Sequence, residues 1–385
     1  MKRLAHLPLR GLAAAALLAT VLSGCSLMPS FLGGRPARVQ PAELAPNPAL
    51  IGVQQAWSAR IGSVDFPLSV HASPELVTVA SADGTVVAFN SATGREAWRA
   101  GVGRALTAGV GSDGKTTAVV TRDNELVALS QGQVLWRHKL AAQAYTAPLV
   151  AGGRVFVLGG DRSVSAHDGT TGRRLWQQQR PGEPLVLRQG GVLLPVGDML
   201  VAGQGGRLTG FNPLNGSVRW DAPIATSRGT NDVERLVDLV GSVSRVGDSV
   251  CARAFQAAVG CVDTARGTVA WTRPANGAQG VSGDERQLFG AESDGRLIAW
   301  RRESGEQGWV NTSLQWRILT APLLVGRSVA VGDGNGFVHL LSREDGSLVN
   351  RLSTDGTAIA AAPVLAGNTL VVVTRGGGVF GFVPQ

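Results

Sequence analysis

Short apolar runs recur along most of the chain, and each is followed by a pair of turn-forming residues. In one copy, the apolar run 76–80 leads into Asp83-Gly84, and a second run ends at Phe89. Such pairs supply the positive φ values of a two-residue β-hairpin. Later copies hold the same place with Asp294-Gly295 and Gly205-Gly206. Runs of this length without helical periodicity predict an all-β chain.

Tryptophans mark the repeat. A glycine stands four residues ahead of a tryptophan in six copies: Gly94 and Trp98, Gly132 and Trp136, Gly172 and Trp176, Gly216 and Trp220, Gly267 and Trp271, Gly305 and Trp309. Successive tryptophans of this set are 38, 40, 44, 51 and 38 residues apart. A seventh copy keeps Gly346 but has Asn350 in place of the tryptophan. A period near 40 residues with short strands is typical of propeller blades.

The two ends of the chain complement each other. Residues 363–382 have the apolar strands of a copy, but the chain stops before the tryptophan strand. Trp57 lies in an isolated strand that no glycine precedes at the usual spacing. Joining the two completes an eighth blade and removes exposed sheet edges. We therefore predict an eight-bladed β-propeller over residues 51–385, with seven blades as the alternative count.

The repeat also places the tryptophans and two cysteines. We interpret the in-register tryptophans as packing between blades rather than as a stacking platform for a ligand. Cys251 and Cys261 fall at the places of Thr78 and Ala88. On a two-residue hairpin these places point to opposite faces of the sheet, which makes a disulfide awkward. We predict two free, buried cysteines.

The start of the chain is typical of an exported protein. Lys2, Arg3 and Arg10 precede and flank a short apolar stretch, residues 11–22, which suits a signal peptide better than a membrane span. The sequence Leu-Ser-Gly-Cys that ends at Cys25 resembles a lipobox. We predict a signal peptide over 1–24 and lipid on Cys25. An ordinary signal peptide with a chance cysteine is the alternative.

The resemblance to bacterial lipoproteins also indicates a location. Ser26, rather than aspartate, follows the cysteine, which favours the outer membrane in such lipoproteins. Residues 25–50 contain five prolines and are predicted to form an extended tether. The formal net charge of +8 falls to about +5 without the signal peptide. Export and the scattered positive charges argue against nucleic-acid binding.

A search for catalytic or metal-binding patterns finds none that is convincing, so we expect no catalytic residue, metal or cofactor. The histidines beyond the signal peptide are in different blades without ligand spacing: His71, His138, His167 and His339. Gly109-x-Gly111-x-x-Gly114 lacks the helix of a dinucleotide site and is interpreted as loop glycine. Asp333-Gly334-Asn335-Gly336 breaks the calcium-loop pattern and is interpreted as a hairpin turn.

The repeat Ala-x-Asp/Asn-x-x-Thr-Gly-x-x-x-Trp resembles that of the eight-bladed quinoprotein alcohol dehydrogenases. That resemblance implies a quinone and calcium at the ring axis. Those enzymes are much longer and carry a vicinal cysteine pair, which this chain lacks. A periplasmic quinone-dependent dehydrogenase-like protein and a ligand-binding propeller are therefore kept only as alternatives.

Two segments are more specific. Residues 319–323 leading into 331–339, and residues 231–238, together with the lipobox and the blade count, resemble the BamB family. This resemblance implies a non-enzymatic lipoprotein of the β-barrel assembly machinery on the periplasmic face of the outer membrane. It also implies binding to the POTRA domains of BamA, with aid to the insertion of nascent barrel proteins.

The same resemblance implies contact residues. Leu185, Leu187 and Arg188 match a leucine/arginine contact segment, and Asp238 matches the first aspartate of an Asp-x-Asp contact. Val240 replaces the second aspartate, which is a departure from the family.

The repeat spacing points to the same region without any resemblance. The longest gap between tryptophans contains a polar insertion over residues 225–239, which includes Arg235. Long loops on rigid scaffolds often carry function, so Arg235 joins the candidate partner contacts, although a solvated loop is the alternative. Arg188 and Arg235 would equally suit surface charges with no partner.

Overall fold

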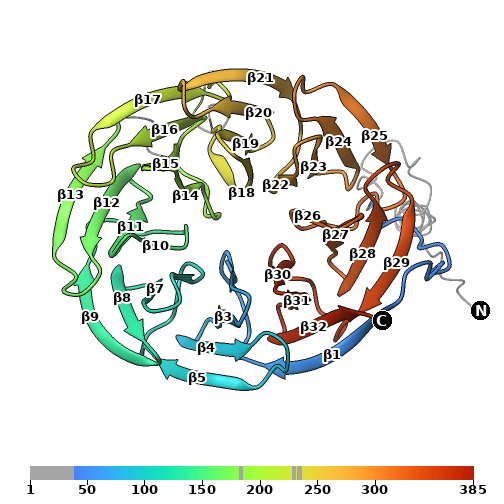
Figure 1. Ribbon diagram of the computed structural model, residues 1–385, viewed down its shortest axis with the longest axis horizontal. Helices are drawn as coiled ribbons and strands as arrows, with labels where there is room; N and C mark the ends of the chain where they lie inside the picture. The colour runs from blue at the N-terminus through green and yellow to red at the C-terminus, as the bar shows by residue number, and fades with distance from the viewer. Residues whose placement is uncertain (1–38, 182–184, 228–230, 232–235) are drawn as a thin grey trace, which may run out of the picture. The chain divides into compact units, whose positions relative to one another are not determined.

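The computed structural model describes residues 39–181, 185–227, 231 and 236–385, and every regular element among them is a β-strand. The strands form eight four-stranded antiparallel sheets arranged around a central axis (Figure 1). Within each sheet, the strand that comes first along the chain lies nearest the axis, except that the last sheet is completed by β1 (Figure 1). The predicted eight-bladed β-propeller is confirmed.

The eight blades follow the chain in order. Blade 1 has β2 (His71–Ala72), β3 (Leu76–Ala80), β4 (Thr85–Asn90) and β5 (Glu96–Gly101). Blade 2 has β6 (Gly111–Ser112), β7 (Thr117–Val120), β8 (Glu125–Ser130) and β9 (Gln133–Lys139). Blade 3 has β10 (Leu149–Ala151), β11 (Arg154–Leu158), β12 (Ser163–Asp168) and β13 (Arg174–Gln179). Blade 4 has β14 (Leu193–Val196), β15 (Met199–Gln204), β16 (Arg207–Phe211) and β17 (Val218–Pro223).

The second half of the ring repeats this order. Blade 5 has β18 (Leu239–Val246), β19 (Ser249–Ala254), β20 (Ala258–Asp263) and β21 (Thr268–Pro274). Blade 6 has β22 (Val281–Gly283), β23 (Gln287–Ala291), β24 (Leu297–Arg301) and β25 (Gln307–Asn311). Blade 7 has β26 (Leu323–Val325), β27 (Ser328–Gly332), β28 (Phe337–Ser342) and β29 (Leu348–Ser353). Blade 8 has β30 (Val364–Ala366), β31 (Thr369–Val373), β32 (Gly378–Pro384) and β1 (Val53–Arg60).

Both chain ends build the closing blade, as predicted. Strand β1 pairs antiparallel with β32, and Trp57 lies opposite Gly381. The indole ring leaves no room at that position, because a Cβ on Gly381 would overlap its atoms. The strand that carries Trp57 is therefore the missing outer strand of blade 8.

The hairpin register corrects the prediction for the cysteines. In blade 1, Thr78 pairs with Ala88, because three residues form the turn rather than the two expected from Asp83-Gly84. A turn that is one residue longer shifts the pairing of the two strands by one residue, so that two side chains expected on opposite faces of the sheet lie on the same face. Cys251 therefore pairs directly with Cys261, and the two form a disulfide. The prediction that both are buried is confirmed, and the prediction that they are free was wrong.

The tryptophans join neighbouring blades. The ring of Trp136 in blade 2 lies against Gly172 in blade 3, where a Cβ would come within 2.5 Å of the ring. The indole N–H of Trp136 donates to the carbonyl oxygen of Gly169 at 2.9 Å. Tryptophan and glycine of successive blades meet in the same way at Trp57 and Gly94, Trp176 and Gly216, Trp220 and Gly267, Trp271 and Gly305, and Trp309 and Gly346. Trp98 and Gly132 also pair, but more loosely, because a Cβ on Gly132 would lie 3.5 Å from the tryptophan. These pairs, called the Trp–Gly clamps below, confirm that the tryptophans pack between blades.

The junction between blades 7 and 8 lacks this clamp. Asn350 occupies the tryptophan place in blade 7, and blade 8 has Val53 where a glycine would stand. The Asn350 side chain instead donates to the carbonyl oxygen of Ile51 at 2.8 Å and accepts from the Asn47 side chain at 2.9 Å. The tryptophan and the glycine that would have packed against each other at this junction are thus both replaced. Polar contacts between Asn350 and the amino-terminal residues take the place of that packing.

Candidate docking site

The connectors between blades emerge at one end of the sheets. Because neighbouring strands are antiparallel, the turn between the second and third strands of a blade lies at the same end as the connector to the next blade. This end is called the loop face below. Residues 185–188, called the docking segment, belong to the connector between β13 and β14 on this face. Asp238 ends the connector that leads into β18, one blade junction further along.

The structure brings the docking segment and Asp238 together. The backbone N–H of Leu187 donates to Oδ2 of Asp238 at 2.9 Å. The guanidinium of Arg162 lies 3.4 Å from Oδ1 of Asp238 and donates to the carbonyl oxygen of Leu185 at 3.1 Å. The Asp238 side chain is only 15% exposed. Its carboxylate is therefore engaged within the chain, where it holds the backbone of the docking segment.

The remaining predicted site residues differ in accessibility. Leu185 is 43% exposed, Arg188 is exposed and Leu187 is half-buried, so the docking segment presents apolar and cationic groups to solvent. Val240 is buried in β18, which means that the departure from the Asp-x-Asp pattern places a core side chain there. Cys25 and Arg235 lie outside the described residues.

Sequence reasoning missed Arg162. It occupies the last position of the turn between β11 and β12, directly after Asp161. Other copies place glycine or asparagine after the aspartate of this turn, as in Asp83-Gly84 and Asp123-Asn124. An arginine at a position where other copies have glycine could have marked this residue as unusual. Its two partners, Leu185 and Asp238, are 23 and 76 residues away along the chain, and the repeat pattern does not predict such contacts.

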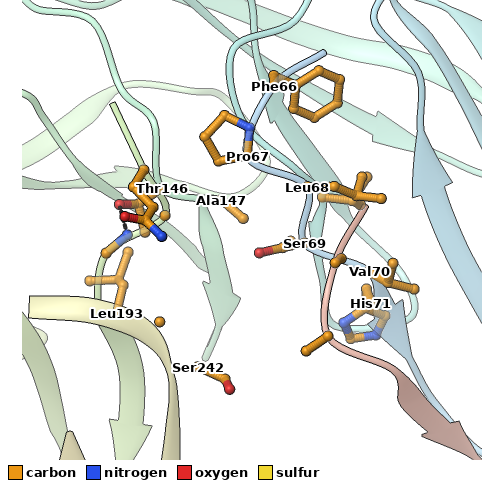
Figure 2. Close-up of a pocket in the computed structure, with 18 of the residues that line it drawn as sticks. Phe66, Pro67, Leu68, Ser69, Val70, His71, Thr146, Ala147, Leu193 and Ser242 are labelled. Carbon is orange, nitrogen blue, oxygen red and sulfur yellow. Dashed lines mark hydrogen bonds between the residues drawn. The ribbon is translucent and has the colours of Figure 1, made fainter. Parts of the chain in front are cut away.

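A cavity of about 720 Å³ lies at the ring axis beside the docking segment. Figure 2 shows residues 66–71 along one side, with Thr146, Ala147, Leu193 and Ser242 around the remainder. Arg188 also lines this cavity, so the docking segment forms part of its wall. The lining is mostly small, apolar and neutral polar groups, which suits a neutral molecule or an extended peptide better than a strongly charged ligand.

Among the described residues that line the cavity, Asp65 and His71 are the possible metal ligands. Burial lowers the pKa of His71, so its imidazole is neutral at pH 7. No cluster of three or more possible metal-ligating side chains occurs in the described part of the chain. Cys251 and Cys261 are buried between β19 and β20 and do not line the cavity.

Two motifs have structural roles. Gly109 precedes β6 and Gly114 lies in the turn that follows it, so the loop interpretation holds for these two glycines, whereas Gly111 lies in β6 itself and the interpretation was wrong for it. The rings of His138 and His167 lie 4.5 Å apart, although the residues come from different blades. Both His167 nitrogens face partners, Ser165 at 3.1 Å and the carbonyl oxygen of Gly172 at 3.2 Å.

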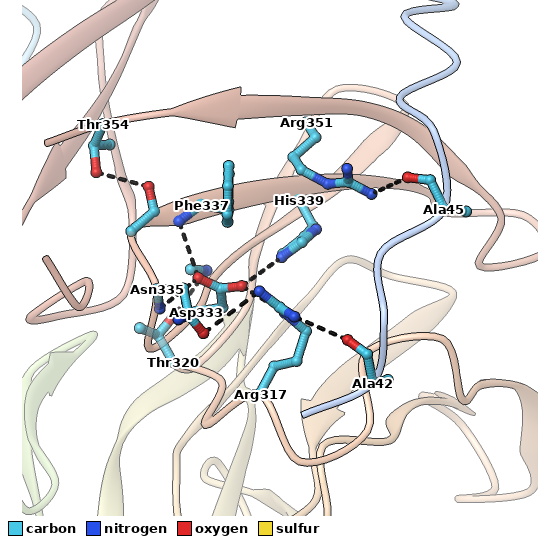
Figure 3. A network of polar contacts seen from close by, with 12 residues as sticks. Ala42, Ala45, Arg317, Thr320, Asp333, Asn335, Phe337, His339, Arg351 and Thr354 are labelled. Atoms are coloured by element: carbon cyan, nitrogen blue, oxygen red, sulfur yellow. Dashed lines mark hydrogen bonds and ion pairs between the residues drawn. The ribbon is translucent and has the colours of Figure 1, made fainter. Parts of the chain in front are cut away.

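The hairpin at Asp333 uses its carboxylate internally (Figure 3). Oδ2 of Asp333 accepts from Nε of Arg317 at 2.8 Å and from Nε2 of His339 at 3.0 Å. Burial alone would raise the pKa of Asp333, but hydrogen bonds from His339, the Phe337 backbone and Arg317 lower it to about 2. The interpretation as a hairpin turn is confirmed.

The same network holds the amino-terminal residues. Residues 41–52, called the strap below, run along blade 7 (Figure 3). Arg317 donates to the carbonyl oxygen of Ala42 at 2.9 Å, and Arg351 donates to that of Ala45 at 2.9 Å. The described end of the predicted tether therefore contacts the propeller, and the tether's boundaries stay a prediction. In the described residues, no helix has the length and apolar character needed to span a bilayer.

Comparisons with known proteins agree on one family. A family model described as "Outer membrane protein assembly factor BamB" matches residues 82–311. The chain is 38% identical over 353 residues to a protein of that name from Burkholderia pseudomallei, covering 91% of this chain and 93% of the relative. It is 37% identical to a namesake from Bordetella pertussis, with 92% of each chain covered.

Solved structures show the same architecture. The crystal structure of BamB from Moraxella catarrhalis superposes with a TM-score of 0.79 at 24% identity, covering 86% of this chain and 99% of that one. A quinohemoprotein alcohol dehydrogenase from Comamonas testosteroni superposes with a TM-score of 0.66 at 14% identity, covering 89% and 78%. Both likenesses concern the fold alone.

Proposed function

Since the chain belongs to the family of outer membrane protein assembly factor BamB, we propose that it is a non-enzymatic scaffold of the β-barrel assembly machinery. It docks on the periplasmic POTRA domains of BamA and aids the insertion of barrel proteins. Lipid on Cys25 holds it at the periplasmic face of the outer membrane. The observation that carries the docking proposal is the meeting of the docking segment with Asp238 on the loop face.

The side chains divide into two roles in this proposal. Leu185 and Leu187 bury apolar surface against the partner, and Arg188 pairs with an acidic group on it. Asp238 holds the docking segment through the Leu187 N–H instead of contacting the partner with its carboxylate. A rigid ring that presents a fixed loop loses little conformational entropy on binding.

A pull-down with the purified periplasmic region of BamA tests the docking site. Leu185→Ser and Arg188→Ala together are expected to reduce recovery of the protein at least tenfold, in line with the loss of about 1.4 kcal/mol or more of binding free energy. The matched control is Leu214→Ser, because Leu214 is 64% exposed but lies in the turn between β16 and β17, at the opposite end of the sheets. Equal recovery of the double variant and the control would show that docking uses another surface.

The axial cavity supports a second candidate, a propeller that binds a small neutral ligand. Native mass spectrometry of the protein purified from its own membrane tests this candidate. A bound small molecule that the cavity-lining substitution Ser242→Trp removes would support it. A bare protein mass, together with recovery of the assembly complex, would favour the scaffold.

A further inference from the structure

Arg162 has a backbone conformation that arginine disfavours. It ends the three-residue turn between β11 and β12 with φ of 63°. The equivalent turn position in five other blades is occupied by glycine or asparagine: Gly84, Asn124, Gly295, Gly336 and Gly377. The left-handed region is unfavourable for residues with a Cβ, and asparagine tolerates it better than arginine does. Blade 3 therefore keeps an arginine where the repeat favours glycine, and a side-chain function explains why.

The Arg162 side chain reaches the docking segment. Its Nη2 donates to the carbonyl oxygen of Leu185 at 3.1 Å and pairs with Oδ1 of Asp238 at 3.4 Å. Oδ2 of the same carboxylate accepts from the N–H of Leu187 at 2.9 Å. The guanidinium and the carboxylate thus hold the segment's backbone through one carbonyl and one N–H. The side chain is only 13% exposed, so solvent screens these contacts less than it would on an open surface.

The surrounding residues fix Arg162 in turn. The Gln204 side chain donates to its carbonyl oxygen at 2.6 Å. Gly205 leaves space for the guanidinium, because a Cβ at that position would lie 2.5 Å from Nη1. Blade 4 therefore binds the Arg162 backbone and accommodates its guanidinium, while the connectors before β14 and β18 bind the guanidinium itself.

We propose that Arg162 is the positioning residue of the docking site. It holds the docking segment in a single conformation, so that Leu185, Leu187 and Arg188 are ordered before a partner arrives. This inference rests on the proposed function for its effect on binding, but its effect on the docking segment can be measured on the protein alone. Ordering the segment in advance lowers the entropy lost on association.

Arg162→Gly is the test, because glycine restores the residue that other blades have at this position. We expect stability to urea to stay the same or rise, since backbone strain is relieved. Hydrogen exchange at the Leu187 amide is expected to accelerate at least tenfold as its acceptor loses support. The Kd for the periplasmic region of BamA is expected to increase about five- to tenfold. Asn124→Gly, at the same place in blade 2, is the matched control and should change neither exchange at Leu187 nor Kd.

The outcomes separate this inference from the proposed function. Unchanged exchange at Leu187 in Arg162→Gly would overturn the positioning role, whatever the binding data. Faster exchange, together with a wild-type protein that does not bind the BamA region, would support positioning and overturn docking. If Arg162→Gly lowers stability to urea, Asp238→Asn removes the same ion pair from the other side, and it must also accelerate exchange at Leu187.

Discussion

At the residue scale, two residues with strained backbone conformations flank a single anchored arginine. Trp316 and Ile318 have φ of 61° and 56°, and Ile318 is 81% exposed. Arg317 between them is buried and bonded to Asp333 and to the strap. The anchoring of this central arginine holds both neighbours at positive φ, which residues with a Cβ disfavour and which is least favourable for a β-branched residue such as Ile318.

Replacing Ile318 therefore isolates the backbone strain. Ile318→Gly is expected to raise the free energy of unfolding by about 0.5–1 kcal/mol, because glycine relieves the strain and little buried surface is lost. Leu214→Gly is the control, since Leu214 is similarly exposed but not at positive φ, and it should lower the free energy of unfolding. Urea denaturation measures both. A loss of stability in Ile318→Gly would mean that the side chain has a stabilising contact.

His167 gives the fold a pH dependence. Burial lowers its pKa from 6.5 to about 4, with smaller contributions from His138 and Arg174, and against an opposing hydrogen bond to Gly172. Because the folded protein keeps this imidazole neutral, its contribution to stability is complete above pH 6.5 and is lost as the pH falls towards 4. A shift of this size corresponds to about 3 kcal/mol.

Unfolding in urea at pH 7, 5 and 4 measures this effect. The wild type should lose about 3 kcal/mol more than His167→Asn between pH 7 and 4, because the variant has no imidazole to protonate. Acidic groups shared by both proteins cancel in this comparison. Parallel pH profiles for the two proteins would contradict the assignment to His167.

At the element scale, the Trp–Gly clamps show how a motif within one blade joins two. Glycine and tryptophan are four residues apart along the chain, yet each glycine packs on the tryptophan of the preceding blade. Each clamp therefore fixes the spacing between neighbouring sheets. Indole N–H groups add hydrogen bonds across the junctions, and that of Trp271 donates to the backbone carbonyl oxygen of Arg302 at 2.7 Å. A large buried ring is well suited to this role.

A matched pair of glycines separates steric fit from backbone strain. Gly172 and Gly103 have φ of 73° and 75°, but a Cβ on Gly172 would meet the Trp136 ring at 2.5 Å and one on Gly103 would meet nothing within 4 Å. Gly103→Ala should lower the free energy of unfolding by about 1 kcal/mol through strain. Gly172→Ala should cost about 2 kcal/mol more through overpacking. Equal losses of stability in thermal or urea unfolding would show that the fit of Gly172 against Trp136 does not stabilise the protein.

The repeat predicted the ring but not its registers. Spacing of Trp57 and the six other tryptophans specified eight blades and the closing strand, because each blade must pack on the next. Asp-Gly pairs occur in both two- and three-residue turns, so the sequence does not reveal the length of a turn. The pairing of Cys251 with Cys261 depends on that length, because one residue more or less in the turn changes the register of the strands. The Arg162 contacts were beyond prediction because connectors carry no repeat. The proposed contacts of Arg235 and the lipid on Cys25 stay predictions.

At the scale of the whole molecule, the strap secures the one junction without a Trp–Gly clamp. It bonds to Arg317 in the connector that leads into blade 7 and to Arg351 and Asn350 in β29, and the chain then enters β1 of blade 8. Leu50 adds a backbone hydrogen bond to Val349 at 2.8 Å. The strap thus spans the two blades that the missing tryptophan would have joined.

Two truncations of the mature chain test this role. A chain that begins at residue 41 should unfold like the full protein, because it keeps the strap. A chain that begins at residue 51 should be less stable by about 2–4 kcal/mol, since several hydrogen bonds of about 1 kcal/mol each are lost. Differential scanning calorimetry of the two compares them directly, and equal transition temperatures would show that β1 closes the ring unaided.

The strap also gives the molecule a defined path for mechanical load. Any pull applied upstream of Ala42 reaches Arg317, in the connector before blade 7, and Arg351, in β29, before it reaches the pairing of β1 with β32. The contacts of the strap are spread along its length, so such a pull must break them before it acts on the closing strand. A ring tethered by its amino terminus would bear tension on a neighbouring blade and leave its seam shut.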